Sequence, residues 1–214
     1  MAKKPFKVKQ SRSRESLKRL LTAATDVLAE GGLEGATIPR IAARAGLSPG
    51  AVYRRFPDKD ALLQTVVLTE LEQIDENTRT QLTPELAEQG SLQHFAKQMI
   101  QGSLQIHRQN STLKRTLDQY VLTHPNAAFR KKVFKLNIGA IRRVADFLLL
   151  KRKEIKHPDP EAAVSFALIQ LAFTLRDVTL LDTISDDWAS ILPKDDDQLL
   201  QELTRAFLSY LGVK

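Results

Sequence analysis

The stretch TIPRIAARAGLSPGAVYRRFPDKDALL, Thr37 to Leu63, decides the fold of this chain. Thr37 is placed to cap a short helix, and Gly46 after it supplies the positive φ that a sharp turn often requires. Ser48 is placed to cap a second short helix, with Pro49 in its first turn, where the missing N–H costs nothing. Two short helices joined by a tight turn predict a helix-turn-helix, a motif whose second helix enters the DNA major groove.

A longer helix precedes this stretch and another follows it. Between Arg14 and Glu30 the apolar residues fall at spacings of three and four, and the pair Gly31-Gly32 ends the pattern. Asp58 is placed to cap a fourth helix that runs toward Gln81. The residues expected to face the core of the three-helix domain are Leu17, Leu20, Leu21, Ala24, Val27, Leu28, Ile38, Ile41, Ala42, Leu47, Val52 and Phe56.

Prolines divide the remaining sequence into windows with helical periodicity, and none of these windows shows the alternating pattern of a strand. We expect helices over residues 84–108, 111–121, 126–155, 161–181 and 195–211, the first of them as one helix or two. The sequence therefore predicts an all-α chain of about nine helices. An N-terminal three-helix domain carries the helix-turn-helix, and a C-terminal helical bundle follows it.

The positive charge of the chain is concentrated at one end. The 214 residues carry a formal net charge of +7. Residues 1–60 contain 13 lysines and arginines against 6 acidic residues, whereas residues 61–214 contain 19 of each. This distribution predicts a basic flexible tail (1–13), a phosphate-binding domain (14–60) and a neutral helical body (61–214). On charge alone, a basic disordered leader explains the surplus equally well.

Several classes of protein are disfavoured by what the sequence lacks. Without cysteine there is no disulfide scaffold, Cys-based zinc finger or thiol nucleophile. No two of the four histidines stand four residues apart, and no Walker or HExxH motif occurs, so we expect no metal, no cofactor and no enzyme activity. The most apolar stretch, residues 162–175, is shorter than the roughly 18–20 residues of a membrane span, so we expect a cytoplasmic protein.

The central stretch resembles the DNA-binding domain of TetR-type transcriptional regulators. The resemblance covers residues 14–63: a first helix ending in glycine, the block Thr-Ile-x-x-Ile-Ala-x-x-Ala-Gly-Leu-Ser, and then Gly-x-Val-Tyr-x-x-Phe-x-x-Lys-x-x-Leu. The matching positions are Thr37, Ile38, Ile41, Ala42, Ala45, Gly46, Leu47, Ser48, Gly50, Val52, Tyr53, Phe56, Lys59 and Leu62. The rest of the chain is similar to the family only in helix content and length.

The resemblance implies roles for individual residues of this motif. Tyr53 would contact a DNA phosphate through its hydroxyl, and the alternative is a half-buried core tyrosine. Lys59 would bind a phosphate beside the free N–H groups at the start of the fourth helix, and the alternative is a solvated surface lysine. Thr37 would cap its helix and also contact a phosphate. Arg40 and Arg44, on the first short helix, would face the DNA backbone.

Base reading is expected from the exposed positions of the second short helix, which are Ser48, Pro49, Gly50, Ala51, Arg54 and Arg55. The small Gly50 and Ala51 let the helix approach base edges. Either arginine is able to pair with guanine, and the alternative that both contact only phosphates stays open. The basic residues of the tail either reach phosphates or a minor groove, or stay disordered.

The resemblance also implies that residues 61–214 bind a small ligand and form a homodimer. Helices 161–181 and 195–211 are the dimer candidates, because the first is too apolar to leave exposed, and Trp188 between them is expected at that interface. Arg176 belongs either to that interface, to a pocket or to the exposed edge of its helix. The candidates for a ligand pocket are His94, Gln98, His107, Arg108, Tyr120 and Arg176.

Together these observations predict a dimeric, sequence-specific DNA-binding regulator, a repressor that binds a near-palindromic operator and responds to an unidentified effector. Two alternatives stay open. One is a DNA-binding regulator without a ligand, whose body serves dimerisation or a protein partner. The other is a helical small-molecule-binding protein or enzyme with a basic docking head.

Overall fold

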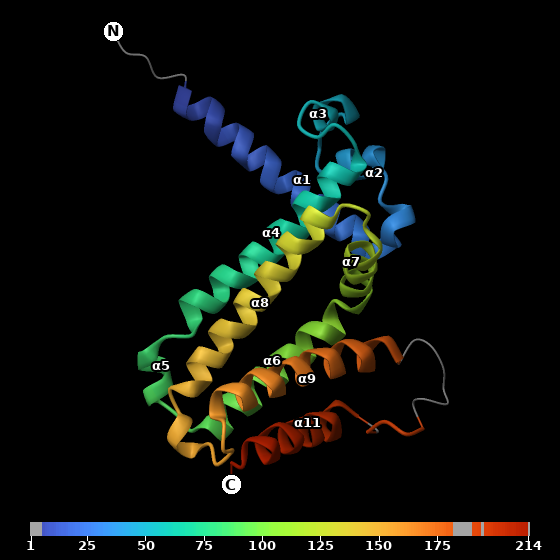
Figure 1. Cartoon of the computed structure of the whole chain (residues 1–214). Coiled ribbons are helices and arrows are strands. Elements are labelled where there is room, and N and C mark those ends of the chain that lie inside the picture. The colour runs from blue at the N-terminus through green and yellow to red at the C-terminus, as the bar shows by residue number, and fades with distance from the viewer. Residues whose placement is uncertain (1–5, 182–189, 194, 214) are drawn as a thin grey trace. The chain divides into compact units, whose positions relative to one another are not determined.

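The computed structural model describes the backbone of residues 6–181, 190–193 and 195–213, and the side chains of residues 13–178, 190–193 and 195–213. This part of the chain forms ten α-helices and no strand, which confirms the predicted all-α class (Figure 1). The helices are α1 (Phe6–Gly35), α2 (Ile38–Arg44), α3 (Pro49–Tyr53), α4 (Lys59–Gln81), α5 (Pro84–Glu88), α6 (Leu92–Gln109), α7 (Ser111–Thr123), α8 (Ala127–Leu149), α9 (Pro160–Leu181) and α11 (Asp196–Leu211), with a 3-10 turn, η1 (Arg152–Glu154), after α8. Trp188 lies outside the described residues.

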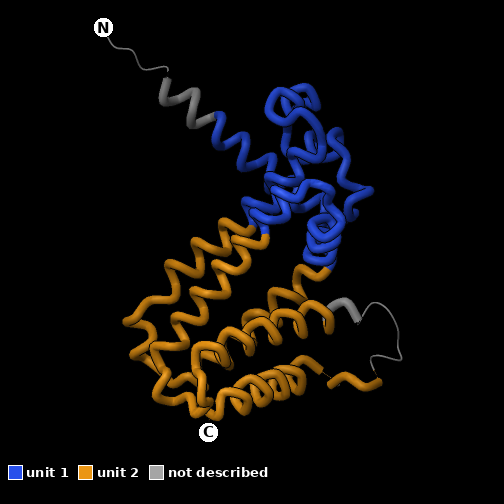
Figure 2. Tube along the Cα trace, in the orientation of Figure 1, with its two compact units in different colours: residues 1–70, 112–133 blue, residues 71–111, 134–214 orange. Residues whose placement is uncertain are grey.

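The chain divides into two compact units (Figure 2). We call residues 1–70 and 112–133 the head unit, and residues 71–111 and 134–214 the body unit. The boundary therefore differs from the predicted one at residue 60, because α4 is one continuous helix and α7 packs on its first turn. The charge separation becomes sharper: the head unit holds 18 lysines and arginines against 8 acidic residues, and the body unit holds 14 against 17.

The first helix of the head unit is longer than predicted. It begins at Phe6 instead of Arg14, because neither proline nor glycine interrupts the sequence from Phe6 to Glu30. Residues 6–13 of the predicted flexible tail are thus helical, and residues 1–5 lie outside the described part. The regular helix ends at the predicted glycine pair, since Gly32 has φ 60° and ψ −163° and only a short helical turn follows it.

The core of the head unit contains most of the apolar residues that the spacing predicted, whereas Leu17 and Leu21 are half-buried. Leu20, Ala24, Val27 and Leu28 of α1 are buried, as are Ile41 and Ala42 of α2, Val52 of α3 and Leu62 of α4. Leu47 is half-buried, and Ala43 of α2 is exposed. Helices α1–α3 and the start of α4 therefore form the predicted helix-turn-helix fold.

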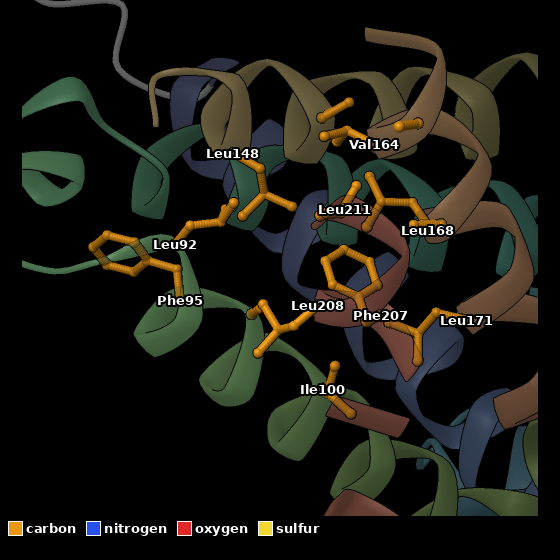
Figure 3. Close-up of a cluster of buried hydrophobic side chains, with 14 of the residues drawn as sticks. Leu92, Phe95, Ile100, Leu148, Val164, Leu168, Leu171, Phe207, Leu208 and Leu211 are labelled. Atoms are coloured by element: carbon orange, nitrogen blue, oxygen red, sulfur yellow. The ribbon is translucent and has the colours of Figure 1, made fainter. Parts of the chain in front are cut away.

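The core of the body unit lies between α6, α9 and α11, with the end of α8 closing it (Figure 3). Its labelled members are Leu92, Phe95, Ile100, Leu148, Val164, Leu168, Leu171, Phe207, Leu208 and Leu211. Helix α8 ends at Leu149 instead of continuing to residue 155, because the chain turns through η1 and the N–H groups of Lys156 and His157 donate to the carbonyl of Leu211.

The described side chains of α9 (residues 160–178) are buried along one face of the helix. Ala163, Val164, Ala167, Leu168 and Leu171 of α9 pack into the core of the body unit. The other face of α9 exposes Phe166, Ile169 and Phe173, three apolar side chains at spacings of three and four. Within a single chain, the described part of α9 therefore leaves one apolar face uncovered.

Candidate nucleic-acid interface

The backbone from Thr37 to Tyr53 has the helix-turn-helix geometry that the sequence predicts. The hydroxyl of Thr37 accepts the N–H of Arg40 at 3.4 Å, and the hydroxyl of Ser48 accepts the N–H of Ala51 at 3.2 Å, so each residue caps its helix. Gly46 has φ 66°, and a Cβ there would meet no atom within 4 Å. Glycine is therefore needed at this turn for its backbone conformation and not for space.

Ser48 lies in the sequence GLSPG, which has the Gly-x-Ser-x-Gly form of a hydrolase nucleophile turn. That motif requires the serine on a turn between a strand and a helix, whereas Ser48 stands between two helices. Its hydroxyl oxygen accepts the first free N–H of α3. Ser48 is thus a capping residue in this chain.

Helix α3 is fixed to the head unit by one side and exposes the other. Val52 is fully buried and Phe56 after the helix is 9% exposed, as predicted for core residues. Tyr53 is 55% exposed, which argues against the alternative of a half-buried core tyrosine. The residues proposed to read bases are exposed, apart from the half-buried Ala51; the exposed ones are Ser48, Pro49, Gly50, Arg54 and Arg55. Their side chains are thus accessible to a major groove.

The two arginines of α2 are held by carboxylates of α1. Arg40 Nη2 lies 2.8 Å from Glu30 Oε2, and Arg44 Nη2 lies 2.6 Å from Glu30 Oε1 and forms a wider pair with Asp26. The hydrogen bond from Arg44 lowers the pKa of Glu30, and Glu30 raises the pKa of Arg44 in turn. Because these ion pairs are solvent-exposed, they contribute little to the stability of the fold. The contact of Arg44 with DNA stays a prediction.

Lys59 is half-buried and stands at the first position of α4. Its Nζ donates to the carbonyl of Leu33, just after the Gly32 kink of α1, at 2.6 Å. The predicted alternative of a solvated surface lysine therefore does not describe it. An ammonium has three donors, so this bond leaves two for a phosphate.

Residues of α7 and of the turn after it bind the first turn of α4, a contact that the sequence did not predict. Tyr120 Oη donates to Asp60 Oδ1 at 2.5 Å, and His124 Nε2 lies 3.0 Å from the same oxygen. Gln64 Nε2 donates to Asp60 Oδ2 at 2.7 Å. We call these four residues the polar clasp. Tyr120 was a candidate for a ligand pocket in the body, but it lies in the head unit with its hydroxyl bound to Asp60.

The other ligand candidates do not converge on one point. His94 and Gln98 are exposed on the first half of α6, and Arg108, near its end, pairs with Asp196 at 2.8 Å. Fourteen residues of helix separate His94 from Arg108, which is about 21 Å. The ring of His107 bonds to the carbonyl of Ser103. Arg176 pairs with Asp177 and lies over the ring of Phe173, so it belongs to the exposed face of α9.

Two exposed basic residues of α1 were missed by the sequence reasoning. Lys18 and Arg19 line a surface hollow of about 280 Å³ together with Arg44 and Ala45 of the helix-turn-helix. The sequence shows both charges, but only the packing of α1 against α2 places them beside Arg44. They are additional candidates for phosphate contacts in the head unit.

Two features are absent from the described residues. None of their helices combines the length and apolar character that crossing a membrane requires. Among the same residues, histidine, aspartate and glutamate side chains do not gather in groups of three or more that would suit a metal ion.

Comparison with known proteins identifies the head. Residues 20–66 match the family described as bacterial regulatory proteins, tetR family. The nucleoid occlusion factor SlmA of Haemophilus ducreyi is 25% identical over 170 residues, which is 79% of each protein. The HTH-type transcriptional repressor KstR of Mycolicibacterium smegmatis is 38% identical over 65 residues, 30% of this chain and 32% of that protein.

Solved structures share the fold along nearly the whole chain. A protein described as a TetR-family transcriptional regulator from Mesorhizobium loti aligns with a TM-score of 0.70 at 20% identity, over 92% of this chain and 97% of that one. The regulator FadR from Bacillus subtilis, in complex with stearoyl-CoA, aligns with a TM-score of 0.62 at 19% identity, over 91% and 96%. Residues 20–66 therefore match the DNA-binding domain of tetR-family regulatory proteins, and the likeness to solved TetR-family structures extends to the fold of nearly the whole chain.

Proposed function

We propose that this chain is a dimeric, sequence-specific repressor whose affinity for its operator is changed by a small ligand bound in the body unit. The observation that carries the proposal is helix α3. It is anchored by Val52, and Tyr53 at its end is exposed together with Arg54 and Arg55 directly after it, on a head unit with a surplus of ten positive charges. An exposed short helix on a basic surface is suited to enter a major groove.

The contacts with DNA divide into two classes in this proposal. Tyr53 and Lys59 bind phosphates, which position the protein without reading sequence. Arg54 or Arg55 pairs with guanine, and the open Gly50 lets the start of α3 approach base edges. The open space beside Gly50 supports this approach, because a Cβ there would meet no protein atom within 4 Å.

The exposed face of α9 supports the proposed dimer. Phe166, Ile169 and Phe173 form one apolar stripe, and Tyr210 of α11 extends it, since its ring centroid lies 5.6 Å from that of Phe166. A second copy of the chain covers such a stripe by presenting the same surface across a two-fold axis. Two heads related in this way bind half-sites about 34 Å apart or somewhat wider, and hence a near-palindromic operator.

An acyl-CoA is the effector class that we propose to test first. The solved structure of FadR from Bacillus subtilis, similar in fold, is described as a complex with stearoyl-CoA. In the body unit of this chain, Ile106 of α6 and Phe134 and Ile138 of α8 expose apolar surface that an acyl chain is able to cover. Effector binding changes operator affinity only if the two DNA-binding states differ in affinity for the effector.

Selection of operators from random DNA tests this proposal. The expected result is an enriched inverted repeat, with fluorescence anisotropy then showing weaker binding in the presence of stearoyl-CoA. Enrichment of a sequence without a repeat would contradict the dimeric geometry. Protein that binds all DNA alike would contradict sequence-specific regulation.

A second candidate is a DNA-binding protein that works without a small ligand. The similarity to SlmA of Haemophilus ducreyi extends over 79% of this chain, well beyond the head, and that protein is named a nucleoid occlusion factor. A thermal-shift series with acyl-CoAs of increasing chain length separates the two candidates. Stabilisation that rises with chain length favours the ligand-controlled repressor, and a flat series together with operator binding favours the second candidate.

A further inference from the structure

Three consecutive residues at the start of α4 are bound to three different helices of the head unit. Asp58 Oδ1 accepts the N–H of Ala61 at 2.8 Å and so caps α4 itself. Lys59 binds the carbonyl of Leu33 at the end of α1. Asp60 binds Tyr120 of α7 and His124, which directly follows that helix. The first turn of α4, where the proposed phosphate ligand Lys59 stands, is thus held from two sides.

The carboxylate of Asp60 is charged within the polar clasp. Burial by itself would raise the pKa of Asp60, but the hydrogen bonds from Tyr120, Gln64 and His124 together hold this pKa below its ordinary value. Tyr120 and His124 are buried, whereas about half of the Asp60 side chain stays exposed. Burial and the bond to Asp60 also raise the pKa of Tyr120, so the phenol remains a donor. Charge-assisted hydrogen bonds of this kind are the stronger ones in proteins.

The clasp is anchored in the corner between α7 and α8. The N–H of Asn126 donates to His124 Nδ1 at 3.0 Å, so this nitrogen is unprotonated and Nε2 carries the proton that faces Asp60. Asn126 also caps α8, because its Oδ1 accepts the N–H of Phe129 at 3.1 Å. The ring of Phe129 packs against those of Tyr120 and His124 at centroid distances of 5.9 and 4.8 Å. The donors to Asp60 are therefore fixed in place.

We propose that Asp60 is a positioning residue for DNA binding: through the polar clasp, the corner between α7 and α8 holds the first turn of α4 so that Lys59 faces a DNA phosphate. The bond from Lys59 to Leu33 fixes one ammonium proton on the α1 side, and the clasp fixes the helix on the α7 side. Loss of either side lets the turn shift relative to α3. This inference rests on the proposed phosphate contact of Lys59.

A double-mutant cycle on operator affinity tests the inference. The two changes are Tyr120→Phe, which removes one donor of the clasp and keeps the aromatic packing, and Lys59→Ala. Tyr120→Phe alone should weaken operator binding roughly threefold to tenfold, which corresponds to the net contribution of one typical hydrogen bond. It should also reduce the slope of log affinity against log salt by up to about one, because a phosphate contact is lost.

In the Lys59→Ala background, Tyr120→Phe should have no further effect on affinity or on the salt slope. Additive effects, or a slope unchanged by Tyr120→Phe, would overturn the inference, because a general loss of fold stability does not depend on Lys59. A wild-type protein that binds no DNA at all would instead overturn the proposed function and this inference with it. Additivity in a protein that does bind its operator overturns the inference alone.

Two further variants keep the test decisive if Tyr120→Phe unfolds the head. Gln64→Ala removes a single donor to Asp60 from the surface of α4 and should give the same dependence on Lys59 with a smaller effect. Thr123→Val is the matched control, because it deletes a hydroxyl of α7 that bonds only within its own helix, to the carbonyl of Gln119. It should leave operator affinity unchanged, and a loss equal to that of Tyr120→Phe would contradict a specific role of the clasp.

Discussion

Replacing Phe173 by glutamate tests the proposed dimer directly. Phe173 is 54% exposed in the single chain, so with about 200 Å² for a phenylalanine side chain about 110 Å² per protomer is available for burial. Across a two-fold interface this is about 220 Å², or about 5 kcal/mol at 25 cal/mol per Å² if burial is complete. Glutamate removes that contribution and places two carboxylates in an apolar contact, so the dimer should weaken at least a thousandfold.

Sedimentation equilibrium of the wild type and of Phe173→Glu measures the change. The helical circular dichroism of the dissociated variant should stay close to that of the wild type, because Phe173 lies outside the core, whereas its melting temperature should fall, because dimerisation no longer stabilises the fold. Leu150→Glu is the matched control, since Leu150 is 55% exposed in the same unit but lies off the α9 stripe. A Phe173→Glu protein that remains dimeric at micromolar concentration would refute the assignment of the interface to α9.

Three further predictions concern the head unit. Lys59→Ala should weaken binding to specific and random DNA alike and lower the salt slope by about one, as anisotropy titrations at several salt concentrations will show; a changed base preference would contradict this. Gly46→Ala should destabilise the head by about 1 kcal/mol in urea unfolding, because φ is 66° and no clash accompanies the added Cβ. The folded pKa of Asp60 is lowered, so the clasp stabilises the fold above the unfolded value of about 3.9 and this contribution is lost as the pH falls through the folded value. Acid unfolding of Asp60→Asn should lack that part of the pH dependence, and an unchanged acid profile would count against the clasp.

The partners of the predicted ligand candidates could not be predicted from residue type alone. Polar residues on helices of the body were considered as pocket residues, yet Tyr120 binds Asp60 and Arg108 pairs with Asp196. Each of these partners is distant in sequence, so neither periodicity nor spacing indicates it. A polar side chain on a helix is satisfied by whatever the tertiary packing brings near it, and that packing is not encoded in a local pattern.

The limits of the N-terminal helix also depend on more than its composition. The lysines and arginines before Arg14 indicated a flexible tail, but an uninterrupted run without proline or glycine lets α1 begin at Phe6. A high content of lysine and arginine indicates that a segment is solvated. The ends of a helix are set instead by helix-breaking residues such as proline and glycine and by capping residues. At the other end of α1 such a breaker is present: the pair Gly31-Gly32 was predicted to end the helix, and the structure has a kink at Gly32 with a short helical turn after it.

The sequence by itself determined the helix-turn-helix. Its signals are local: Thr37 and Ser48 cap helices through bonds three residues away, and Gly46 permits its own backbone angle. Tertiary structure alone decided what holds this motif to the rest of the head, because Asp60 meets Tyr120 and His124 some sixty residues further on. The tertiary structure also places residues 112–133, which carry five basic side chains, in the head unit. Local bonds are encoded by spacing, whereas contacts across sixty residues form only when the helices have packed.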